Sequence, residues 1–219
     1  SDSSSQMMAE HLSLFKSRER LEDEVTIEHD KRIDLFSTNA EVNLLNERMI
    51  ESLRGIPYSV EATLSIIGDE PKSVKEKVKM AIRDRNDHTE TIGLRLSVIF
   101  KVGGRYFIPV NVNLADGLVN GAMGTLMSID LDNNGQPNTL WVKFDHKSVG
   151  FERRQMLQNC KSCFEQVKNG WTPIWRVSKN FSTCRKKLTG RISMFPLFYA
   201  YGFTVAKAQG NSHIGITTV

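Results

Sequence analysis

Residues 32–55, "RIDLFSTNAEVNLLNERMIESLRG", decide the fold class of this chain. A short buried strand is predicted by three apolar residues: Ile33, Leu35 and Phe36. Thr38 and Glu41 then stand three residues apart, the spacing of a capping box, which satisfies free amide groups where a helix begins. Apolar residues follow with helical spacing and end before a glycine: Val42, Leu45, Met49, Leu53 and Gly55. The stretch predicts a strand–turn–helix unit of an α/β layer.

A second strand is predicted near the end of the sequence. Residues 194–210, "MFPLFYAYGFTVAKAQG", begin as a near-continuous apolar run, which is typical of a strand in a parallel sheet. Polar and flexible residues follow this run directly, as in "AKAQGNS" at 206–212. Open α/β sheets bind their ligands at the carboxyl ends of the strands. We therefore expect a ligand-facing edge at this point.

Between these two units the hydrophobic period changes. Residues 58–67 alternate as a half-exposed strand does, and residues 69–90 have the spacing of one helix, with Val74, Val78 and Ile82 on its apolar side. From Leu94 onward the period is two, in runs that include Tyr106–Val112, Met127–Leu131 and Leu140–Phe144. "DNNGQ" at 132–136 is a hairpin turn signal. Several short strands with such turns predict a small antiparallel barrel or sandwich, inserted in the α/β layer.

This pattern predicts four parts of the chain. They are a peripheral helix or linker over 1–32, a first α/β part over 33–93, an inserted β unit over 94–190 and a second α/β part over 191–219. The sequence does not begin with Met, which indicates a segment or a processed product. It has 3 cysteines, which favours a reducing compartment over a disulfide framework. No apolar run approaches the length of about 18 residues that a membrane span needs, so we expect no membrane partner.

The charges are unevenly distributed. Residues 1–95 carry 14 Lys+Arg against 19 Asp+Glu, a net of −5, whereas residues 96–219 carry 15 against 6, a net of +9. The basic half includes Arg153, Arg154, Lys179, Arg185, Lys186, Lys187, Arg191 and Lys207. A one-sided positive field suits a polyanion, most often a nucleic acid. A solvated basic face is the alternative interpretation.

Two groups of residues could hold phosphates. Thr38 and Asn39, with Asn43 and Asn46 further along the predicted helix, offer hydroxyl and amide groups at a helix N-terminus, where the dipole favours an anion. The alternative is that these residues only cap the helix. The second group follows the late strand: Thr204, Lys207, Gln209 and Gly210. The alternative there is a core strand with a lysine at its solvated end.

Other chemical motifs are weaker. Cys160 and Cys163 form a C-x-x-C, with His146 upstream and Cys184 downstream. A structural zinc site needs four ligands at suitable spacing, so free thiols are favoured and no metal is assigned. "NGAMG" at 120–124 lacks the lysine and hydroxyl of a phosphate-binding loop, and a tight turn is predicted instead.

Taken in order, five segments of the sequence resemble the petite-integration-frequency family of superfamily-one DNA helicases. "LFSTNAEVNLLNERMIESL" is similar to the family's fourth motif, and "FPLFYAYGFTVAKAQG" to its fifth, usually Thr-Ile/Val-His-Lys-Ser-Gln-Gly. Between them, "LRLSVIFKVGGRYFIPVNVNLADGLVNGAMGTL" resembles the segment that leads into the family's inserted barrel. "LWVKFDHKSVG" and "WTPI" resemble barrel strands of Helitron-like and arthropod-type members. The resemblance runs from about Ile33 to the last residue.

The resemblance implies the carboxyl-terminal portion of an ATP-dependent 5′→3′ DNA helicase. Its expected fold is the second RecA-like α/β domain, in part, with an inserted Src-homology-type β-barrel. The implied contacts with the phosphates of single-stranded DNA are Thr38, Asn39, Thr204, Lys207, Gln209 and Gly210. ATP and Mg²⁺ would bind with a missing amino-terminal RecA-like domain. DNA repair, recombination or telomere maintenance are the implied processes, in the nucleus or alternatively in the mitochondrion.

Some residues depart from the family's pattern. Ala206 and Ala208 replace the usual histidine and serine of the fifth motif, which removes hydrogen-bonding groups. No G-x-x-x-x-G-K-[ST] occurs, and no arginine motif follows the fifth motif, so we expect no ATP hydrolysis by this chain alone and assign no catalytic residue. The alternative function is a non-catalytic relic of a helicase that binds nucleic acid or protein.

Overall fold

The structure is a computed structural model, and it describes residues 33–85, 91–183, 188–205 and 216–218. The peripheral helix or linker predicted over 1–32 lies outside the described residues. The described residues belong to one compact unit, which begins at Ile33. The domain boundaries predicted inside this unit stay predictions. The boundary predicted between residues 190 and 191 falls within strand β10 (Thr189–Met194). None of the described helices is both long and apolar enough to cross a lipid bilayer.

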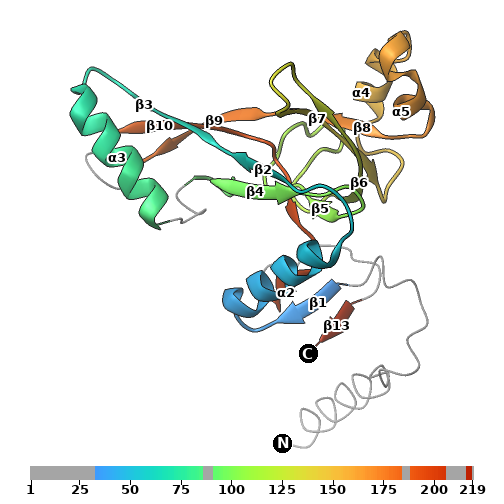
Figure 1. The fold of residues 1–219 in the computed structure, drawn as a ribbon, viewed down its shortest axis with the longest axis horizontal. Helices are drawn as coiled ribbons and strands as arrows, with labels where there is room; N and C mark the ends of the chain where they lie inside the picture. The colour runs from blue at the N-terminus through green and yellow to red at the C-terminus, as the bar shows by residue number, and fades with distance from the viewer. Residues whose placement is uncertain (1–32, 86–90, 184–187, 206–215, 219) are drawn as a thin grey trace, which may run out of the picture. The chain divides into compact units, whose positions relative to one another are not determined.

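A three-stranded parallel sheet contains the first predicted strand. Its order is β12-β1-β13, and its strands are β1 (Ile33–Phe36), β12 (Gly202–Thr204) and β13 (Ile216–Thr218). Both pairings with β1 are parallel. Helix α2 (Asn39–Ser52) packs against β1 and β12, and Figure 1 shows α2 beside β1. Since parallel strands and a covering helix are present together, the predicted mixed α/β class is confirmed.

Two further sheets are antiparallel. One pairs β2 (Tyr58–Glu61) with β4 (Ser97–Phe100), and the other has the order β3-β10-β9, with β3 over Thr63–Ile67 and β9 over Val177–Ser182. The alternation predicted for residues 58–67 is confirmed by four buried residues: Val60, Ala62, Leu64 and Ile66. The backbone N–H of Ala62 donates to the Leu96 carbonyl at 2.7 Å, and at this point the chain passes from one sheet to the other. The predicted helix is α3 (Lys72–Arg85), which buries Val78 and Ile82.

The fourth sheet has five antiparallel strands in the order β11-β5-β6-β7-β8. They are β5 (Arg105–Phe107), β6 (Met123–Leu131), β7 (Pro137–Phe144), β8 (Thr172–Ile174) and β11 (Phe198–Tyr199). The predicted hairpin turn joins β6 to β7, with Asp132 N–H donating to the Gln136 carbonyl at 2.8 Å. No closed barrel is found among the described strands, since the edge strands β8 and β11 do not pair with each other. Both edge strands are short, with three residues in β8 and two in β11.

Two local features interrupt the predicted alternation. β5 ends at Phe107, whereas the apolar pattern predicted a strand as far as Val112. Pro109 has no N–H for a sheet ladder, and Ile108 instead pairs with the turn at 121–122, its N–H donating to the Ala122 carbonyl at 2.9 Å. In β6 the register shifts between residues 126 and 128. Such a bulge reverses the facing of the residues beyond it, so the predicted apolar face at Met127–Leu131 is only partly buried.

The apolar run from residue 194 is two strands rather than one. β11 belongs to the five-stranded sheet and β12 to the parallel sheet, so the prediction of a single parallel strand was wrong. Between them the Ala200 N–H donates to the Arg105 carbonyl, and the Tyr201 hydroxyl accepts from the Arg105 N–H, both at 3.0 Å. The Tyr199 hydroxyl accepts from the Ile99 N–H at 3.0 Å, and burial raises the pKa of Tyr199. The two tyrosines thus satisfy backbone N–H groups of neighbouring strands, Tyr201 one in β5 and Tyr199 one in β4.

The main core lies among the antiparallel sheets. Phe100, Tyr106 and Phe195 are fully buried, with ring centroids 5.4 Å apart for Phe100 and Tyr106 and 5.8 Å apart for Phe100 and Phe195. The Tyr106 hydroxyl accepts from the Lys101 N–H at 2.9 Å, and desolvation raises the pKa of this tyrosine. A smaller core lies under the parallel sheet and consists of Ile33, Leu35, Phe107, Ala200 and Phe203. Phe107 of β5 therefore connects the antiparallel part to the parallel sheet.

Candidate functional site

The carboxyl ends of the parallel strands lie at one edge of the sheet. Phe36, the last residue of β1, pairs with Thr204, the last residue of β12. Leu35 pairs with Thr218, the last residue of β13. Residues 37–39 follow β1 directly and so begin beside the end of β12. This register confirms the prediction that the two strand ends, far apart in the sequence, lie side by side on one sheet.

At this edge Thr38 forms the predicted capping box. Its hydroxyl accepts from the Glu41 N–H at 3.3 Å and donates to Glu41 Oε2 at 2.7 Å, and its own N–H donates to the same oxygen at 3.1 Å. Capping therefore accounts for the Thr38 side chain. Asn39 is the first residue of α2 and is exposed, and its side chain makes no hydrogen bond to another described residue. Of the two, Asn39 is the one whose amide is open to a ligand.

The second predicted group is described only in part. Thr204 is partly buried at the end of β12, beside Phe36. Lys207, Gln209 and Gly210 lie outside the described residues. The structure therefore brings Thr204 next to the turn that holds Asn39, and the other three assignments stay predictions.

Asn46 does not have the role that the sequence predicted for it, that of an amide donor to an anion. It is buried, with 1% of its surface exposed. Its Oδ1 accepts from the N–H groups of Tyr201 and Gly202 at 3.0 and 3.1 Å, and its Nδ2 donates to the Gly202 carbonyl at 3.3 Å. Asn46 therefore fixes α2 to the start of β12, and its amide is not available to a ligand. Asn43 is half-buried on the same helix.

Arg95 is a further cation, which the sequence analysis did not single out. The Arg95 guanidinium lies 4.0 Å from the centroid of the Phe198 ring, and burial lowers the pKa of Arg95. Phe198 packs edge-on against Phe107, which packs in the same way against Phe203 of β12, at 6.4 and 4.9 Å between centroids. No carboxylate of the described residues forms an ion pair with Arg95. Its position between two leucines of an alternating run is the signal that could have identified it.

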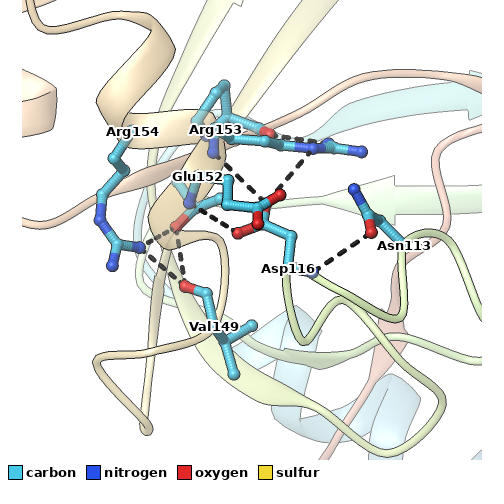
Figure 2. Close-up of polar contacts among 8 residues, drawn as sticks. Asn113, Asp116, Val149, Glu152, Arg153 and Arg154 are labelled. Carbon is cyan, nitrogen blue, oxygen red and sulfur yellow. Dashed lines mark hydrogen bonds and ion pairs between the residues drawn. The ribbon is translucent and has the colours of Figure 1, made fainter.

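A second polar cluster surrounds Asp116, the aspartate of the "DGLVNGAMG" segment (Figure 2). Its buried carboxylate accepts from the N–H groups of Glu152 and Arg153 at 2.8 and 3.4 Å, and it lies 4.0 Å from Arg153 Nε. The Asp116 N–H donates to Asn113 Oδ1 at 3.2 Å. Glu152 and Arg153 belong to the first turn of helix α4 (Phe151–Met156), where a carboxylate satisfies free amide groups. This motif therefore anchors α4 and is part of the fold.

Two arginines of the basic half are held in the same cluster. Arg154 donates to the Val149 carbonyl at 2.7 Å and also to Thr172 and Lys147 (Figure 2 labels Val149 and Arg154). Arg153 donates to the Pro173 carbonyl at 3.1 Å and lies 5.1 Å from the centroid of the Trp175 ring. Burial lowers the pKa of both arginines. The net charge of the sequence therefore overstates the number of cations that are free to meet a polyanion.

Gly150 permits this cluster to form, and its replacement should therefore lower the stability of the fold. It has a φ of 75°, its N–H donates to the Asp116 carbonyl at 2.8 Å, and a Cβ there would overlap the buried Thr172 side chain. Gly135 has a similar φ of 74° but open space around it. We expect Gly135→Ala to cost about 1 kcal/mol of unfolding free energy and Gly150→Ala about 1 kcal/mol more. Urea denaturation of both variants tests this, and equal losses would contradict the overlap.

These features define a mixed α/β protein in which a parallel sheet continues into antiparallel sheets. Solved structures of Pif1 helicases share this fold. Unliganded Pif1 from Bacteroides sp has a TM-score of 0.51 at 19% identity, over 86% of this chain and 46% of that one. Bacteroides Pif1 in complex with ADP-AlF3 and ssDNA has a TM-score of 0.51 at 18% identity, over 88% and 35%. Pif1 from Candida albicans has a TM-score of 0.58 at 16% identity, over 88% and 40%.

The present chain thus spans less than half the length of these three proteins. No protein-family profile and no curated protein matches the chain. At this level of identity the likeness shows the fold. The predicted resemblance is therefore confirmed as a Pif1-like helicase fold, while the Helitron-like or arthropod type and the position in a longer protein stay predictions.

Proposed function

We propose that this chain is the carboxyl-terminal part of an ATP-dependent 5′→3′ DNA helicase, and that it holds the phosphates of single-stranded DNA at the carboxyl edge of its parallel sheet. The observation that carries the proposal is the pairing of Phe36 with Thr204. This pairing brings the end of the segment that resembles the fourth motif beside the strand of the fifth. The Bacteroides neighbour that was solved with ssDNA supports the choice of ligand.

Each group at this edge has a proposed part in binding. The exposed Asn39 amide offers N–H donors to phosphate oxygens at the N-terminus of α2, where the helix dipole favours an anion. Thr204 offers a hydroxyl from the neighbouring strand, and Lys207, Gln209 and Gly210 follow it in sequence. Arg95, stacked on Phe198 and without a carboxylate partner in the described part of the chain, is a further candidate cation.

ATP and Mg²⁺ belong, in this proposal, to the intact helicase. The described residues bring together no group of three or more His, Cys, Asp or Glu side chains that could hold a metal ion. Because the sequence has no G-x-x-x-x-G-K-[ST], the proposal places the nucleotide and its metal against a separate amino-terminal RecA-like domain. In that arrangement the present domain, RecA-like with its antiparallel sheets inserted, passes movement between that domain and the DNA strand. The nucleus, or alternatively the mitochondrion, is the proposed compartment.

The proposal predicts weak binding of single-stranded DNA that depends strongly on salt. Neutralising Z phosphates of a single strand gives a slope of about −0.7Z in log K against log salt, so four contacts would lower the affinity about 50-fold over a fourfold rise in salt. Anisotropy of a labelled oligonucleotide, titrated at low and moderate salt, measures this slope. Absence of binding at low salt would contradict the proposal and favour the alternative of a non-catalytic, protein-binding relic.

Matched variants test whether specific residues or only diffuse positive charge bind the DNA. We expect Lys207→Ala to reduce the salt slope by about 0.7, and Lys72→Ala, at the exposed start of α3, to leave it unchanged. Asn39→Ala should weaken binding without lowering stability, because the Thr38 cap is kept. Thr38→Ala is less informative, since loss of the cap itself costs about 1 kcal/mol. Equal losses for the two lysine variants would show that only diffuse charge acts.

A further inference from the structure

The Cys160–Cys163 pair lies in a tight turn between α4 and the short helix α5 (Phe164–Lys168). Lys161–Cys163 form one turn of 3₁₀-helix, closed by the Cys163 N–H, which donates to the Cys160 carbonyl at 3.1 Å. Both cysteines are free thiols and partly exposed. α4, this turn and α5 contain no fully buried residue. A small reagent in solution can therefore reach both sulfur atoms.

The turn holds the two thiols at a separation that suits a disulfide. A 3₁₀-helix rises about 2 Å per residue, so residues three apart are about 6 Å apart along its axis. Disulfides join Cα atoms that are about 4.4–6.8 Å apart. The Ser162 hydroxyl lies 3.3 Å from Cys160 Sγ and 3.8 Å from Cys163 Sγ, so both sulfur atoms contact the same oxygen. Oxidation of the pair therefore needs side-chain rotation but no rearrangement of the fold.

The two thiols are chemically different. Hydrogen bonds from the Cys163 thiol and the Ser162 hydroxyl stabilise the Cys160 thiolate and lower the pKa of Cys160. The hydrogen bond to Cys160 raises the pKa of Cys163. Because the thiolate is the attacking species in disulfide exchange, Cys160 is suited to attack and Cys163 to resolve the mixed disulfide.

A metal site is a weaker explanation of this pair. Zinc in a structural site takes four ligands. Within the described part of the chain, no third His, Cys, Asp or Glu joins the two cysteines in a metal-binding group. The pair supplies both thiols of a disulfide in one turn. It supplies only two of the four ligands that a structural zinc ion takes.

We propose that Cys160 and Cys163 are a redox-active dithiol that exchanges with small-molecule disulfides such as oxidised glutathione. The Cys160 thiolate attacks one sulfur of the external disulfide, its S–S bond breaks, and one thiolate leaves and takes a proton from water. Cys163 loses its proton to solvent and attacks the Cys160 sulfur, which forms the Cys160–Cys163 bond and releases the second thiolate. Overall, the protein dithiol and one external disulfide give a protein disulfide and two small thiols.

Peptide mass analysis after exchange tests the proposal. The reduced chain, carrying Cys184→Ser so that only this pair can react, is incubated with oxidised glutathione at neutral pH, quenched in acid and digested. We expect the peptide that contains both cysteines to become lighter by two hydrogens and to retain no glutathione. A peptide that carries one stable glutathione on each cysteine would overturn the proposal, since the turn would then not support the internal bond.

One variant and one trapping experiment test the separate roles. In the same background, Cys163→Ser should accumulate glutathione on Cys160, because no second thiol is present to resolve the mixed disulfide. With both cysteines in place, an early acid quench followed by peptide fragmentation should locate the transient glutathione on Cys160, since its pKa is lowered and that of Cys163 is raised. Transient glutathione mainly on Cys163 would overturn the assignment of Cys160 as the attacking thiol.

Discussion

Replacement of Asn46 by alanine is expected to lower the free energy of unfolding by about 4 kcal/mol, the largest effect that we predict for a single residue. The variant leaves the N–H groups of Tyr201 and Gly202 without the acceptor that they share in the native structure. A buried amide group without a partner costs about 1–3 kcal/mol, and two are affected here. Urea denaturation followed by circular dichroism gives the value.

Asn43→Ala is the matched control, since Asn43 lies on the same helix but is only half-buried. Its expected change is within about 0.5 kcal/mol, as for most substitutions away from buried networks. Asn46 also separates two interpretations of this helix. If Asn46→Ala weakened DNA binding and left stability unchanged, the residue would be a ligand contact, and its assignment to the attachment of α2 would be wrong.

The second large effect is expected at the Arg105–Asp145 ion pair. Two hydrogen bonds of 2.7 Å join the guanidinium to the carboxylate, and the side chains are only 5% and 19% exposed. Asp145→Ala leaves the arginine charge largely buried and uncompensated, so we expect a loss of about 3 kcal/mol in unfolding free energy. Because the pair is shielded from ions, the loss should persist at high salt. Urea denaturation at two salt concentrations measures both quantities.

A double variant tests whether the loss of stability in Asp145→Ala comes from the unpaired arginine charge or from packing. Replacing both residues together, as Arg105→Met with Asp145→Leu, removes both charges and should recover most of the stability that Asp145→Ala loses. Glu76→Ala, which breaks the exposed Lys79–Glu76 pair, should leave the unfolding midpoint unchanged. If the double variant were less stable than Asp145→Ala, the loss would come from packing and not from an unpaired charge.

Local signals in the sequence predicted the elements well where neighbouring residues decide the structure. The Thr38–Glu41 capping box, the α3 helix and the turn at residues 132–136 were all read correctly, because each depends on contacts within a few residues. The pattern failed at Pro109 and at the bulge after Leu126, where one residue changes the hydrogen bonding of a strand. It also failed at residues 198–204, where one apolar run supplies two sheets.

Part of the candidate site was predictable in the same way. Thr38 and Asn39 were placed at the start of a helix, and the chain order of the motifs predicted that Thr204 would lie beside them. The structure separates their roles, since Thr38 is used in the cap whereas Asn39 is exposed. Arg95 was missed because its importance depends on stacking over Phe198, which is distant in sequence.

The sequence by itself determined the mixed α/β class, the beginning of helix α2 and the order of the motifs, because periodicity, caps and turns are encoded by residues close together. Only the tertiary structure decided which polar side chains are free. Asn46 and Asn39 have the same side chain in the same helix, yet the first is bound to backbone groups 155 and 156 residues away and the second is exposed. The reason is that a polar side chain is satisfied by whatever the fold brings to it, and such long-range contacts leave no periodic pattern in the sequence.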